Sequence, residues 1–392
     1  MSPARAYLFG GGGTGGHLFP GLAIAEKVAE LEHARSGSTP RILFLSSNRP
    51  IDASILSAAR IGDAPVTFEP TPAAPFVLSP KGMVKFLGGW GPTIRQSRQA
   101  IRAMRGPSKG PDRNVEVRVI ALGGFVAAPV VQAARVERAP ITMLNLDAVP
   151  GLANRWISKR AATVFTSAVV SDPIAKDWTP IPPIVRAQAI APGEPGAPDT
   201  MARCRREMGL DPSLRTLLVT GASQGARSIN RLMELFIERH REALAGWQLL
   251  HQTGKDEADR TREMYAKGGI PARVETFIAS MGLAWGAADL AVSRAGAGSV
   301  GEAWANRVPT ILMPYPYHKD QHQRANAAPL EKSGGSLVVQ DLIEPEPNLG
   351  LAGARLADLL TDASKRDAMR RALASLGPAD GAERVARSLV EP

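Results

Sequence analysis

A glycine-rich run that ends in a histidine carries the first chemistry in the sequence. Residues 10–17 read GGGGTGGH, and Gly11, Gly13 and Gly16 fit the pattern G-x-G-x-x-G. Glycines let the backbone approach a ligand closely, and the start of a helix presents free N–H groups, so the run predicts an anion site. Imidazole exchanges protons near neutral pH, which suits His17 to general-base catalysis; a capping or packing role is the alternative.

A dinucleotide site is another interpretation of this loop. Such a site requires an acidic residue at the end of the second strand, where it holds a ribose hydroxyl. Residues 45–49 read LSSNR there, without a carboxylate. Because Ser47 and Arg49 suit a 2′-phosphate, an NADP-binding oxidoreductase remains open.

A second glycine loop lies in the second half of the chain. The apolar run 216–220 (TLLVT) is followed by GASQGAR at 221–227, and a helix is predicted from about Ser228. Strand, glycine loop and helix again predict an anion pocket. Ser223 and Arg227 add a hydroxyl and a guanidinium to it.

Apolar runs of strand length alternate with helical patterns along the chain and must position these loops. Strands are predicted over residues 6–9, 41–46, 117–122, 141–144, 216–220, 248–251, 274–277, 290–293 and 310–314. The first helix is predicted to begin near Pro20, and a third glycine loop, 123–125, follows a strand. Short buried strands that alternate with helices form parallel sheets, so the predicted fold is α/β with two doubly wound domains.

Proline content predicts where the two domains join. Residues 171–200 hold seven prolines, a density that interrupts strands and helices and is typical of a linker. We therefore expect an N-terminal domain over 1–170, a C-terminal domain over 201–365 and a cleft between them. A C-terminal helix over about 366–392 is expected to pack back on the first domain.

Composition excludes several classes of protein. The chain has 392 residues and one cysteine, Cys204, which excludes a disulfide scaffold and a cysteine-based zinc site. The most apolar stretch, 119–131, is too short to span a membrane, and the first residues do not resemble a signal peptide. We therefore expect a soluble, cytoplasmic protein.

A basic, apolar segment suggests a phosphate-bearing surface as a partner. The chain has a net charge of +10, and residues 70–110 contain seven basic residues, up to Lys109, and no acidic one. Such a segment suits an anionic membrane surface; an ordinary solvated helix is the alternative, and nucleic acid is not expected. The expected membrane patch comprises Phe76, Lys81, Lys85, Phe86, Leu87, Trp90 and Arg95.

Several motifs together resemble one family of enzymes, the MurG-type bacterial cell-wall glycosyltransferases. The resemblance runs from residue 6 to about residue 335 in the family's order. The motifs are GGGTGGHLFPGLAIAE (11–26), GASQGARSIN (221–230), HQTGK (251–255), SRAGAGSVGEAWANRVPTILMPYP (293–316) and HKDQHQRANAAPLEKSG (318–334).

The resemblance implies the two-domain GT-B fold and a reaction. N-acetylglucosamine would pass, with inversion, from UDP-N-acetylglucosamine on the C-terminal domain to a lipid-linked muramyl-pentapeptide on the N-terminal domain. It also implies a peripheral enzyme on the cytoplasmic face of the inner membrane, without a metal or other cofactor. The sequence lacks an Asp-x-Asp triplet, which agrees, so N–H groups of the glycine loops must hold the leaving diphosphate.

The resemblance also implies roles for individual residues. His17 would be the catalytic base. The resemblance places Thr14, Gly15 and Gly16 near the acceptor and donor phosphates. It places Ser223, Gln224, Gly225 and Arg227 near the donor diphosphate. The backbone of Ile278 would contact the uracil. The stretch Ala297, Gly298, Ser299, Val300, Gly301 and Glu302 would end in the glutamate that holds the ribose, although a solvated helix residue is the alternative for Glu302. Gln323 and Asn326 would bind the sugar hydroxyls, with His318, Asp320 and His322 nearby.

Two departures from the family pattern leave alternatives open. Where the family has His-Glu-Gln-Asn, residues 144–147 read LNLD, so an amide at the active-site edge is replaced by Asp147, or by Asn145 if the loop is shifted. The linker motif Gly-Asn-Pro-Val-Arg is also absent, with APGEP at 191–195 in its region. A related transferase with another lipid acceptor, or a nucleotide-sugar binding protein without activity, remains possible.

Overall fold

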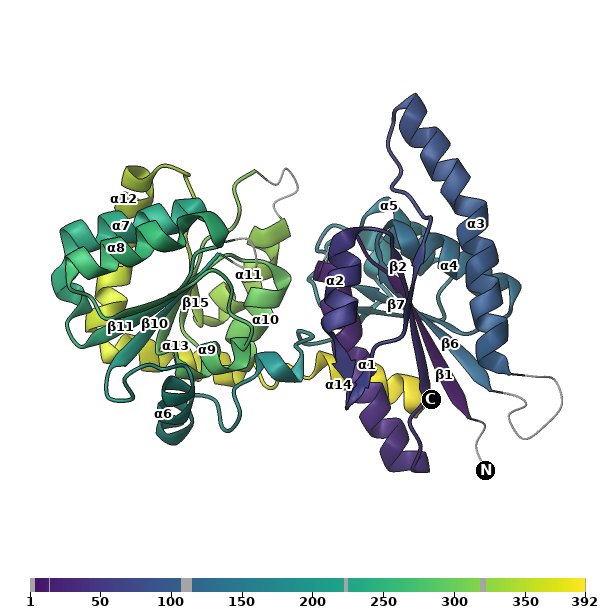
Figure 1. Cartoon of the computed structure of the whole chain (residues 1–392), viewed down its shortest axis with the longest axis horizontal. Coiled ribbons are helices and arrows are strands. Elements are labelled where there is room, and N and C mark those ends of the chain that lie inside the picture. Colours follow the sequence, from purple (N-terminus) through teal and green to yellow (C-terminus); the bar gives the residue numbers. More distant parts are fainter. Residues whose placement is uncertain (1–3, 14, 107–114, 222–224, 318–321, 392) are drawn as a thin grey trace. The chain divides into compact units, whose positions relative to one another are not determined.

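The computed structural model describes residues 4–13, 15–106, 115–221, 225–317 and 322–391 (Figure 1). The chain divides into two compact units. Unit 1 comprises Met1–Arg186 and Asp380–Pro392, and unit 2 comprises Ala187–Ala379. Each unit is an α/β domain with its own parallel sheet, which confirms the predicted fold class.

Unit 1 alternates strands with helices as the sequence predicts. Its strands are β1 (Arg5–Gly11), β2 (Arg41–Ser47), β3 (Arg60–Ile61), β4 (Ala64–Pro65), β5 (Phe68–Thr71), β6 (Glu116–Gly123), β7 (Ile141–Asn145), β8 (Thr163–Thr166) and β9 (Thr179–Pro180). Its helices are α1 (Gly15–Ser36), α2 (Pro50–Ala58), α3 (Pro80–Arg105), α4 (Gly124–Val136), α5 (Leu152–Ser158), the 3-10 turn η1 (Pro173–Ala175) and α14 (Gly381–Val390).

Unit 2 repeats this alternation with different lengths. Its strands are β10 (Arg215–Thr220), β11 (Trp247–Gln252), β12 (Ala272–Glu275), β13 (Leu290–Ser293), β14 (Thr310–Leu312) and β15 (Ser336–Val338). Its helices are α6 (Pro198–Glu207), α7 (Arg227–His240), α8 (Ala258–Gly268), α9 (Met281–Ala287), α10 (Ala297–Ala305), α11 (His322–Ser333), α12 (Pro345–Thr361) and α13 (Ala363–Ser375), with the 3-10 turns η2 (Ala187–Ala189), η3 (Arg241–Leu244) and η4 (Lys255–Glu257).

Both sheets reverse their strand order beside the strand that carries a glycine loop. The order is β5-β2-β1-β6-β7-β8-β9 in unit 1 and β12-β11-β10-β13-β14-β15 in unit 2, and neighbouring strands are parallel. The chain leaves β1 and β10 toward one side of the sheet and later returns on the other. Ligands of open parallel sheets bind at the carboxyl end of such a switch point, which is where both glycine loops lie.

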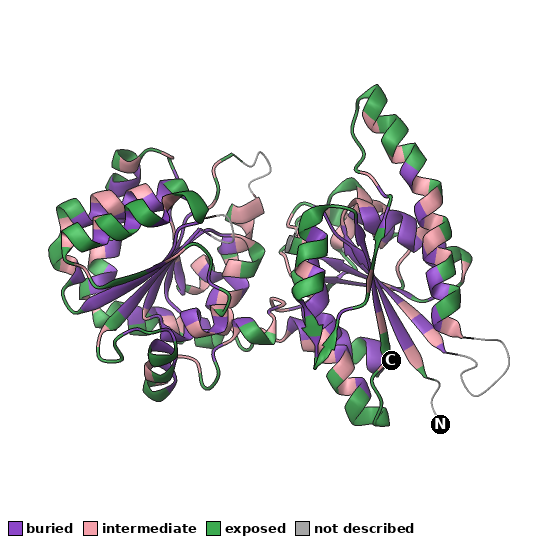
Figure 2. Cartoon of the chain, viewed as in Figure 1, coloured by how far each residue is buried: buried purple, intermediate pink, exposed green. Residues whose placement is uncertain are grey.

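Helices cover both faces of each sheet, and buried residues concentrate in the strands (Figure 2). In unit 1, α3, α4 and α5 contribute to one apolar core, and α1, α2 and α14 contribute to the other. In unit 2, α7, α8 and α12 share one core, and α6, α9, α10, α11 and α13 share the second. Because interior strands such as β1, β6 and β10 are buried on both faces, their sequences are nearly continuous apolar runs.

The first helix begins earlier than predicted. It starts at Gly15 rather than near Pro20, so His17 lies in its first turn and Pro20 lies inside it. A proline this close to the start of a helix removes a single backbone hydrogen bond, that to the carbonyl of Gly16, and can be accommodated there. His17 therefore belongs to the helix N-terminus that was predicted to bind an anion.

The proline-rich segment 171–200 is divided between the units. Its first part contains η1 and β9, and β9 pairs with β8 at the edge of the sheet of unit 1. An edge strand can include Pro180 because the N–H that proline lacks would have no partner there. The segment ends in the first turn of α6, where Pro198 is the first helical residue.

The C-terminal helix α14 packs beside α1 in unit 1 (Figure 1). Val385 and Leu389 are buried in the core that α1 also lines. The last carbonyls of α14 accept hydrogen bonds from two strands, that of Val390 from Arg5 and that of Leu389 from Arg118 at 2.6 Å. Guanidinium groups at this end complement the negative end of the helix dipole. The preceding helix, α13, belongs to unit 2.

Candidate active site

The first glycine loop is held by a buried aspartate from α2. Asp52 is fully buried, and its Oδ2 accepts from the N–H of Gly13 at 2.7 Å, from Ser47 Oγ at 2.6 Å and from Ser47 N at 3.1 Å. Arg49 donates to the carbonyl of Gly13, in the next peptide, at 2.8 Å. The arginine also lies over the ring of Phe125, 5.4 Å from its centroid.

These bonds change the interpretation of Ser47 and Arg49. In the NADP alternative both would suit a 2′-phosphate, yet Arg49 binds the glycine loop and Ser47 binds Asp52, which holds that loop. The end of β2 has no carboxylate, but Asp52 in the first turn of α2 brings one close to it. This carboxylate binds the glycine loop. The NADP interpretation therefore loses the residues that supported it.

His17 lies against the third glycine loop. A Cβ placed on Gly123 would be 3.3 Å from His17 Cε1, and one placed on Gly124 would be 3.6 Å from His17 Nε2. Gly123 and Gly124 have φ values of +93° and +75°, so glycine serves both the close approach and the backbone conformation. His17 Nδ1 is buried and has no hydrogen-bond partner among the described residues.

A network of buried amides lies at the ends of β7 and β8. Asn154 donates to Asn145 Oδ1 at 3.0 Å, and Asn145 donates to the carbonyl of Asp147 at 2.7 Å and to Thr166 Oγ1 at 3.1 Å. Of the two candidates for the amide at the active-site edge, Asn145 is thus committed to this network. Asp147 remains half-buried and contributes its carbonyl.

The second glycine loop is held by backbone packing. Gly225 has φ +72°, and a Cβ there would lie 2.0 Å from the carbonyl oxygen of Thr253. A chain of hydrogen bonds supports Thr253: Asn230 donates to its carbonyl at 3.1 Å and contacts His251 Nε2, while Tyr265 contacts His251 Nδ1. Burial lowers the pKa of His251 to about 3, so this imidazole is neutral and structural.

The N-terminal end of helix α10 faces solvent. Ala297 and Gly298 are exposed, and an added Cβ on Gly298 would meet nothing within 4 Å. Glu302, in the next turn, accepts a hydrogen bond from Trp285 Nε1 at 2.8 Å. Burial raises the pKa of Glu302 to about 7, although the indole hydrogen bond acts in the opposite direction. Glu302 is thus not the solvated helix residue considered as its alternative.

Helix α11 brings two amides to this part of unit 2. Gln323 Oε1 accepts from the N–H of Tyr315 at 2.8 Å. The Asn326 amide satisfies both neighbours when its oxygen faces the N–H of Ala297 and its nitrogen faces the carbonyl of His322, each at 3.3 Å. Asn326 therefore lies directly at the N-terminus of α10.

Two other residues predicted to bind the UDP-sugar already interact with groups of the protein. The N–H of Ile278 donates to Gln252 Oε1 at 3.0 Å. Arg227 is exposed at the start of α7 and lies 3.8 Å from Glu257. Thr14, Ser223 and Gln224 lie outside the described residues, as do Lys109, His318 and Asp320.

The expected membrane patch divides into exposed and packed side chains. Lys81, Lys85, Leu87 and Arg95 are exposed, and Phe76 is about half exposed. Phe86 and Trp90 are partly buried in an aromatic ladder: Phe76 contacts Phe86, Phe86 contacts Trp90, and Trp90 contacts Trp156 of α5.

The arginines at the other end of α3 face another helix of unit 1. Arg98, Arg102 and Arg105 all pair with Glu137 at the end of α4. The guanidiniums of Arg102 and Arg98 lower the pKa of Glu137. This half of α3 is thus tied to its own unit by ion pairs with one carboxylate, which offsets part of its positive charge.

Comparisons with known proteins agree across both units. Residues 7–166 match the glycosyltransferase family 28 N-terminal domain, and residues 216–385 match the C-terminal domain. A relative from Geobacter sulfurreducens is 32% identical over 98% of this chain and 97% of its own length. One from Clavibacter michiganensis is 35% identical over 97% and 94%. Both are named UDP-N-acetylglucosamine--N-acetylmuramyl-(pentapeptide) pyrophosphoryl-undecaprenol N-acetylglucosamine transferase.

The chain is a MurG-type member of glycosyltransferase family 28. The crystal structure of Acinetobacter baumannii MurG superposes with a TM-score of 0.68, at 22% identity, and covers 99% of this chain and 100% of its own. The calicheamicin glycosyltransferase CalG4 shares the fold with a TM-score of 0.57 at 16% identity and complete coverage of both chains. The predicted family, the GT-B fold and the hexosyltransferase class are thereby confirmed.

Some residues that contact the predicted site elements were not predicted from the sequence. Asp52 sits in an ordinary helical pattern, and Trp285 is distant from Glu302 in sequence, so neither carries a local signal. Arg186 could have been found: Val185 and Arg186 match the last two residues of the linker motif, six residues before the segment assigned to it. Arg186 pairs with Glu26 of α1 at 2.5 Å.

The described residues contain neither a metal-binding cluster nor a membrane-spanning helix. Within the described ranges, no cluster of three or more His, Cys, Asp or Glu residues is arranged to hold a metal ion. Of the helices in those ranges, none has the length and apolar character needed to cross a membrane.

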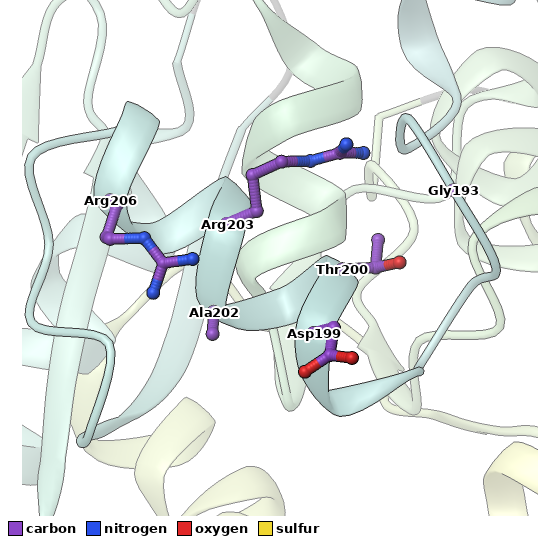
Figure 3. A pocket seen from close by; sticks show the side chains of 6 residues that line it. All are labelled: Gly193, Asp199, Thr200, Ala202, Arg203 and Arg206. Atoms are coloured by element: carbon purple, nitrogen blue, oxygen red, sulfur yellow. The ribbon is translucent and has the colours of Figure 1, made fainter.

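A surface hollow of about 430 Å³ lies beside α6 in unit 2 (Figure 3). Its lining consists of Gly193, Asp199, Thr200, Ala202, Arg203 and Arg206. None of the predicted donor or acceptor residues belongs to it. The candidate site is therefore defined by the glycine loops at the strand ends and not by this hollow.

Proposed function

We propose that this chain transfers N-acetylglucosamine from UDP-N-acetylglucosamine to the muramyl 4-hydroxyl of undecaprenyl-pyrophosphoryl-N-acetylmuramyl-pentapeptide, a step of peptidoglycan synthesis. The observation that carries the proposal is the match to transferases named for this reaction, which covers 98% of the chain and includes all three glycine loops. The donor belongs to unit 2 and the acceptor to unit 1.

Glu302 holds the donor ribose in this proposal. An ionised carboxylate accepts hydrogen bonds from two neighbouring hydroxyls at once. The hydrogen bond from Trp285 leaves one carboxylate oxygen with further acceptor capacity and fixes the side chain. The uracil meets the backbone near Ile278, and the amides of Gln323 and Asn326 bind the sugar hydroxyls.

The leaving diphosphate is stabilised by backbone N–H groups instead of a metal ion. The candidates are the first turn of α10, with its exposed Ala297 and Gly298, and the loop that ends at Gly225. Preorganised N–H groups stabilise developing negative charge because they need no reorganisation during the reaction. Arg227, exposed beside this loop, adds a positive charge.

His17 deprotonates the acceptor. The muramyl 4-hydroxyl gives its proton to the imidazole while its oxygen attacks the anomeric carbon from the face opposite UDP. The bond between that carbon and the UDP oxygen breaks, UDP leaves as the anion, and the configuration is inverted. His17 is suited to this role because its ring is seated on Gly123 and Gly124 at the carboxyl edge of the sheet.

A transfer assay tests the proposal. The full chain is incubated with UDP-N-acetylglucosamine and a water-soluble lipid I analogue, and the disaccharide product is identified by mass. We expect one N-acetylglucosamine added per acceptor, also in the presence of EDTA. No product with this acceptor, or a strict requirement for a divalent cation, would contradict the proposal. UDP and NADPH are compared by thermal shift; we expect stabilisation by UDP alone.

Membrane attachment is assigned to the first half of α3. This half extends beyond the other elements of its own unit (Figure 1) and is largely exposed (Figure 2). Leu78, Val84 and Leu87 are 89%, 71% and 64% exposed, next to the exposed Lys81 and Lys85. Apolar side chains that enter the headgroup region beside lysines give reversible binding, favoured by anionic lipid and weakened by salt.

Vesicle co-sedimentation tests this attachment. Val84→Ser with Leu87→Ser is expected to reduce binding to anionic vesicles and turnover on a vesicle-embedded acceptor, while turnover on the soluble analogue is retained. These positions are preferred to Phe86 and Trp90, which are packed in the aromatic ladder. Leu351→Ser, at an exposed position of α12 in unit 2, is the matched control. Binding that depends on neither lipid charge nor the double substitution would refute the assignment.

A further inference from the structure

The β1–α1 and β6–α4 loops of unit 1 are in contact, and His17 is seated on the second of them. A Cβ on Gly124 would lie 3.0 Å from the carbonyl oxygen of Gly12, and one on Gly13 would lie 2.8 Å from the ring of Phe125. The carbonyl of Gly12 thus packs on Gly124, which also contacts His17, and Gly13 packs on the neighbouring Phe125. A shift of the first loop would therefore move the imidazole relative to the acceptor.

The first loop cannot hold this conformation by chain geometry alone. Gly12 and Gly13 have φ values of +151° and +94°, and glycine visits many other conformations with similar ease. A group outside the loop must select one conformation. Asp52 is suited to this because its Oδ2 binds the N–H of Gly13 at 2.7 Å and is anchored to β2 through Ser47.

We propose that Asp52 is a positioning residue for the transfer reaction. It fixes the peptide between Gly12 and Gly13 and, through the contact of this peptide with Gly124, the position of the His17 ring. The inference rests on the proposed function, since it assumes that His17 acts on the acceptor. Asp52 itself is fully buried and touches neither substrate. It acts by hydrogen bonding and not through its charge.

The hydrogen-bond pattern supplies a discriminating substitution. All three donors approach Oδ2, whereas Oδ1 is buried and has no partner among the described residues. An asparagine can put its carbonyl oxygen in the place of Oδ2 and keep all three bonds. Asp52→Asn is therefore expected to retain the position of the loop, whereas Asp52→Ala removes the anchor.

A matched control exists at the other end of the same sheet. Glu32 is also buried and accepts a hydrogen bond from Tyr7 at 2.5 Å, close to the amino end of β1. Glu32→Ala removes a buried carboxylate from unit 1 without touching the glycine loops. This variant shows how a loss of stability in unit 1 alone affects the reaction.

Steady-state kinetics and histidine NMR test the proposal together. Asp52→Ala is expected to lower kcat about tenfold to a hundredfold, the scale for a misplaced catalytic group, with the Kd for UDP unchanged. Asp52→Asn is expected to stay within about threefold of the parent enzyme, and Glu32→Ala to retain kcat in its folded fraction. The His17 ring signal, assigned with His17→Gln, should shift in Asp52→Ala and not in Glu32→Ala.

The outcomes separate this inference from the proposed function. If the parent chain transfers sugar and Asp52→Ala does so equally well, or if Asp52→Asn is as impaired as Asp52→Ala, the positioning role is wrong. Equal losses in Asp52→Ala and Glu32→Ala would also overturn it, since they would indicate stability alone. If the parent chain transfers nothing, the proposed function fails, while the His17 signal still tests the link to Asp52.

Discussion

The two units hold similar glycine loops by different means. In unit 1, side chains from outside the loop bind its peptides: Asp52 takes the N–H of Gly13 and Arg49 takes its carbonyl. In unit 2, the loop is held by direct contact of backbones, since Gly225 leaves no room for a Cβ beside the carbonyl of Thr253. Both loops follow the central strand of a parallel sheet and precede a helix.

The difference teaches how one motif serves two tasks. A loop held by side-chain hydrogen bonds can be adjusted one bond at a time, which suits the placement of a reacting group such as His17. A loop packed on its neighbour's backbone forms a rigid surface, which suits a site that binds the same diphosphate in every cycle. On this basis we expect unit 1 to control the rate of the transfer and unit 2 to control donor affinity.

Removal of the imidazole should give the largest effect. His17→Ala is expected to lower kcat by about 10²–10⁴-fold, the usual contribution of a general base, while the Kd for UDP is unchanged. Stopped-time assays with the soluble acceptor analogue and calorimetry with UDP measure the two quantities. Near-normal turnover would reduce His17 to a structural residue and remove the division of tasks between the units.

Removal of the Glu302 carboxylate should affect donor binding by unit 2. Glu302→Ala removes hydrogen bonds to a charged group, each worth about 1.5–3 kcal/mol, which corresponds to roughly a 10–150-fold weaker Kd for UDP. Calorimetry with UDP measures this change, and kcat at saturating donor should fall less. An unchanged Kd would remove Glu302 from the donor site.

A methyl group on the rigid loop tests the packing difference directly. In Gly225→Ala the new Cβ meets a backbone oxygen at a positive φ, so the loop must move. Strain of about 1–3 kcal/mol per unfavourable backbone conformation predicts UDP binding weaker by roughly 5–150-fold. Gly350→Ala in α12, where nothing lies within 4 Å of an added Cβ, is the control and should bind UDP normally. Equal binding by the two variants would contradict the backbone-packing account.

The smallest expected effect is a pH dependence that belongs to unit 2. Because burial raises the pKa of Glu302 to about 7, the carboxylate of the free enzyme takes up a proton as the pH falls below 7. Only the ionised form accepts from both ribose hydroxyls, so UDP affinity should fall by up to about tenfold per pH unit below 7. Titrations between pH 6 and 8 with the parent chain and Glu302→Gln test this. The variant should lose that part of the slope, because titration of the UDP phosphates is common to both; identical slopes would exclude Glu302 as the source.

The architecture followed from local patterns in the sequence. The central strands were predicted within one or two residues, because a strand buried on both faces must be a short apolar run. Edge strands such as β5 and β9 were not, since an edge strand has a less apolar sequence and can contain proline. The start of α1 was also placed too late because Pro20 was taken as its first residue.

Motif residues indicated the family and most of the candidate site: the glycine loops and His17 indicate an anion site with a base, and the family resemblance implies the ribose role of Glu302. Only the tertiary structure decided how those residues are held. Asp52 reaches Gly13 across 39 positions of sequence, and Trp285 meets Glu302 through the packing of α9 against α10. Likewise, Arg98, Arg102 and Arg105 contribute to the basic composition, yet the fold turns all three toward Glu137. The sequence specifies which groups are present and how far apart they lie along the chain. Hydrogen bonds and burial depend on distances in space, which are set only when separate elements pack together.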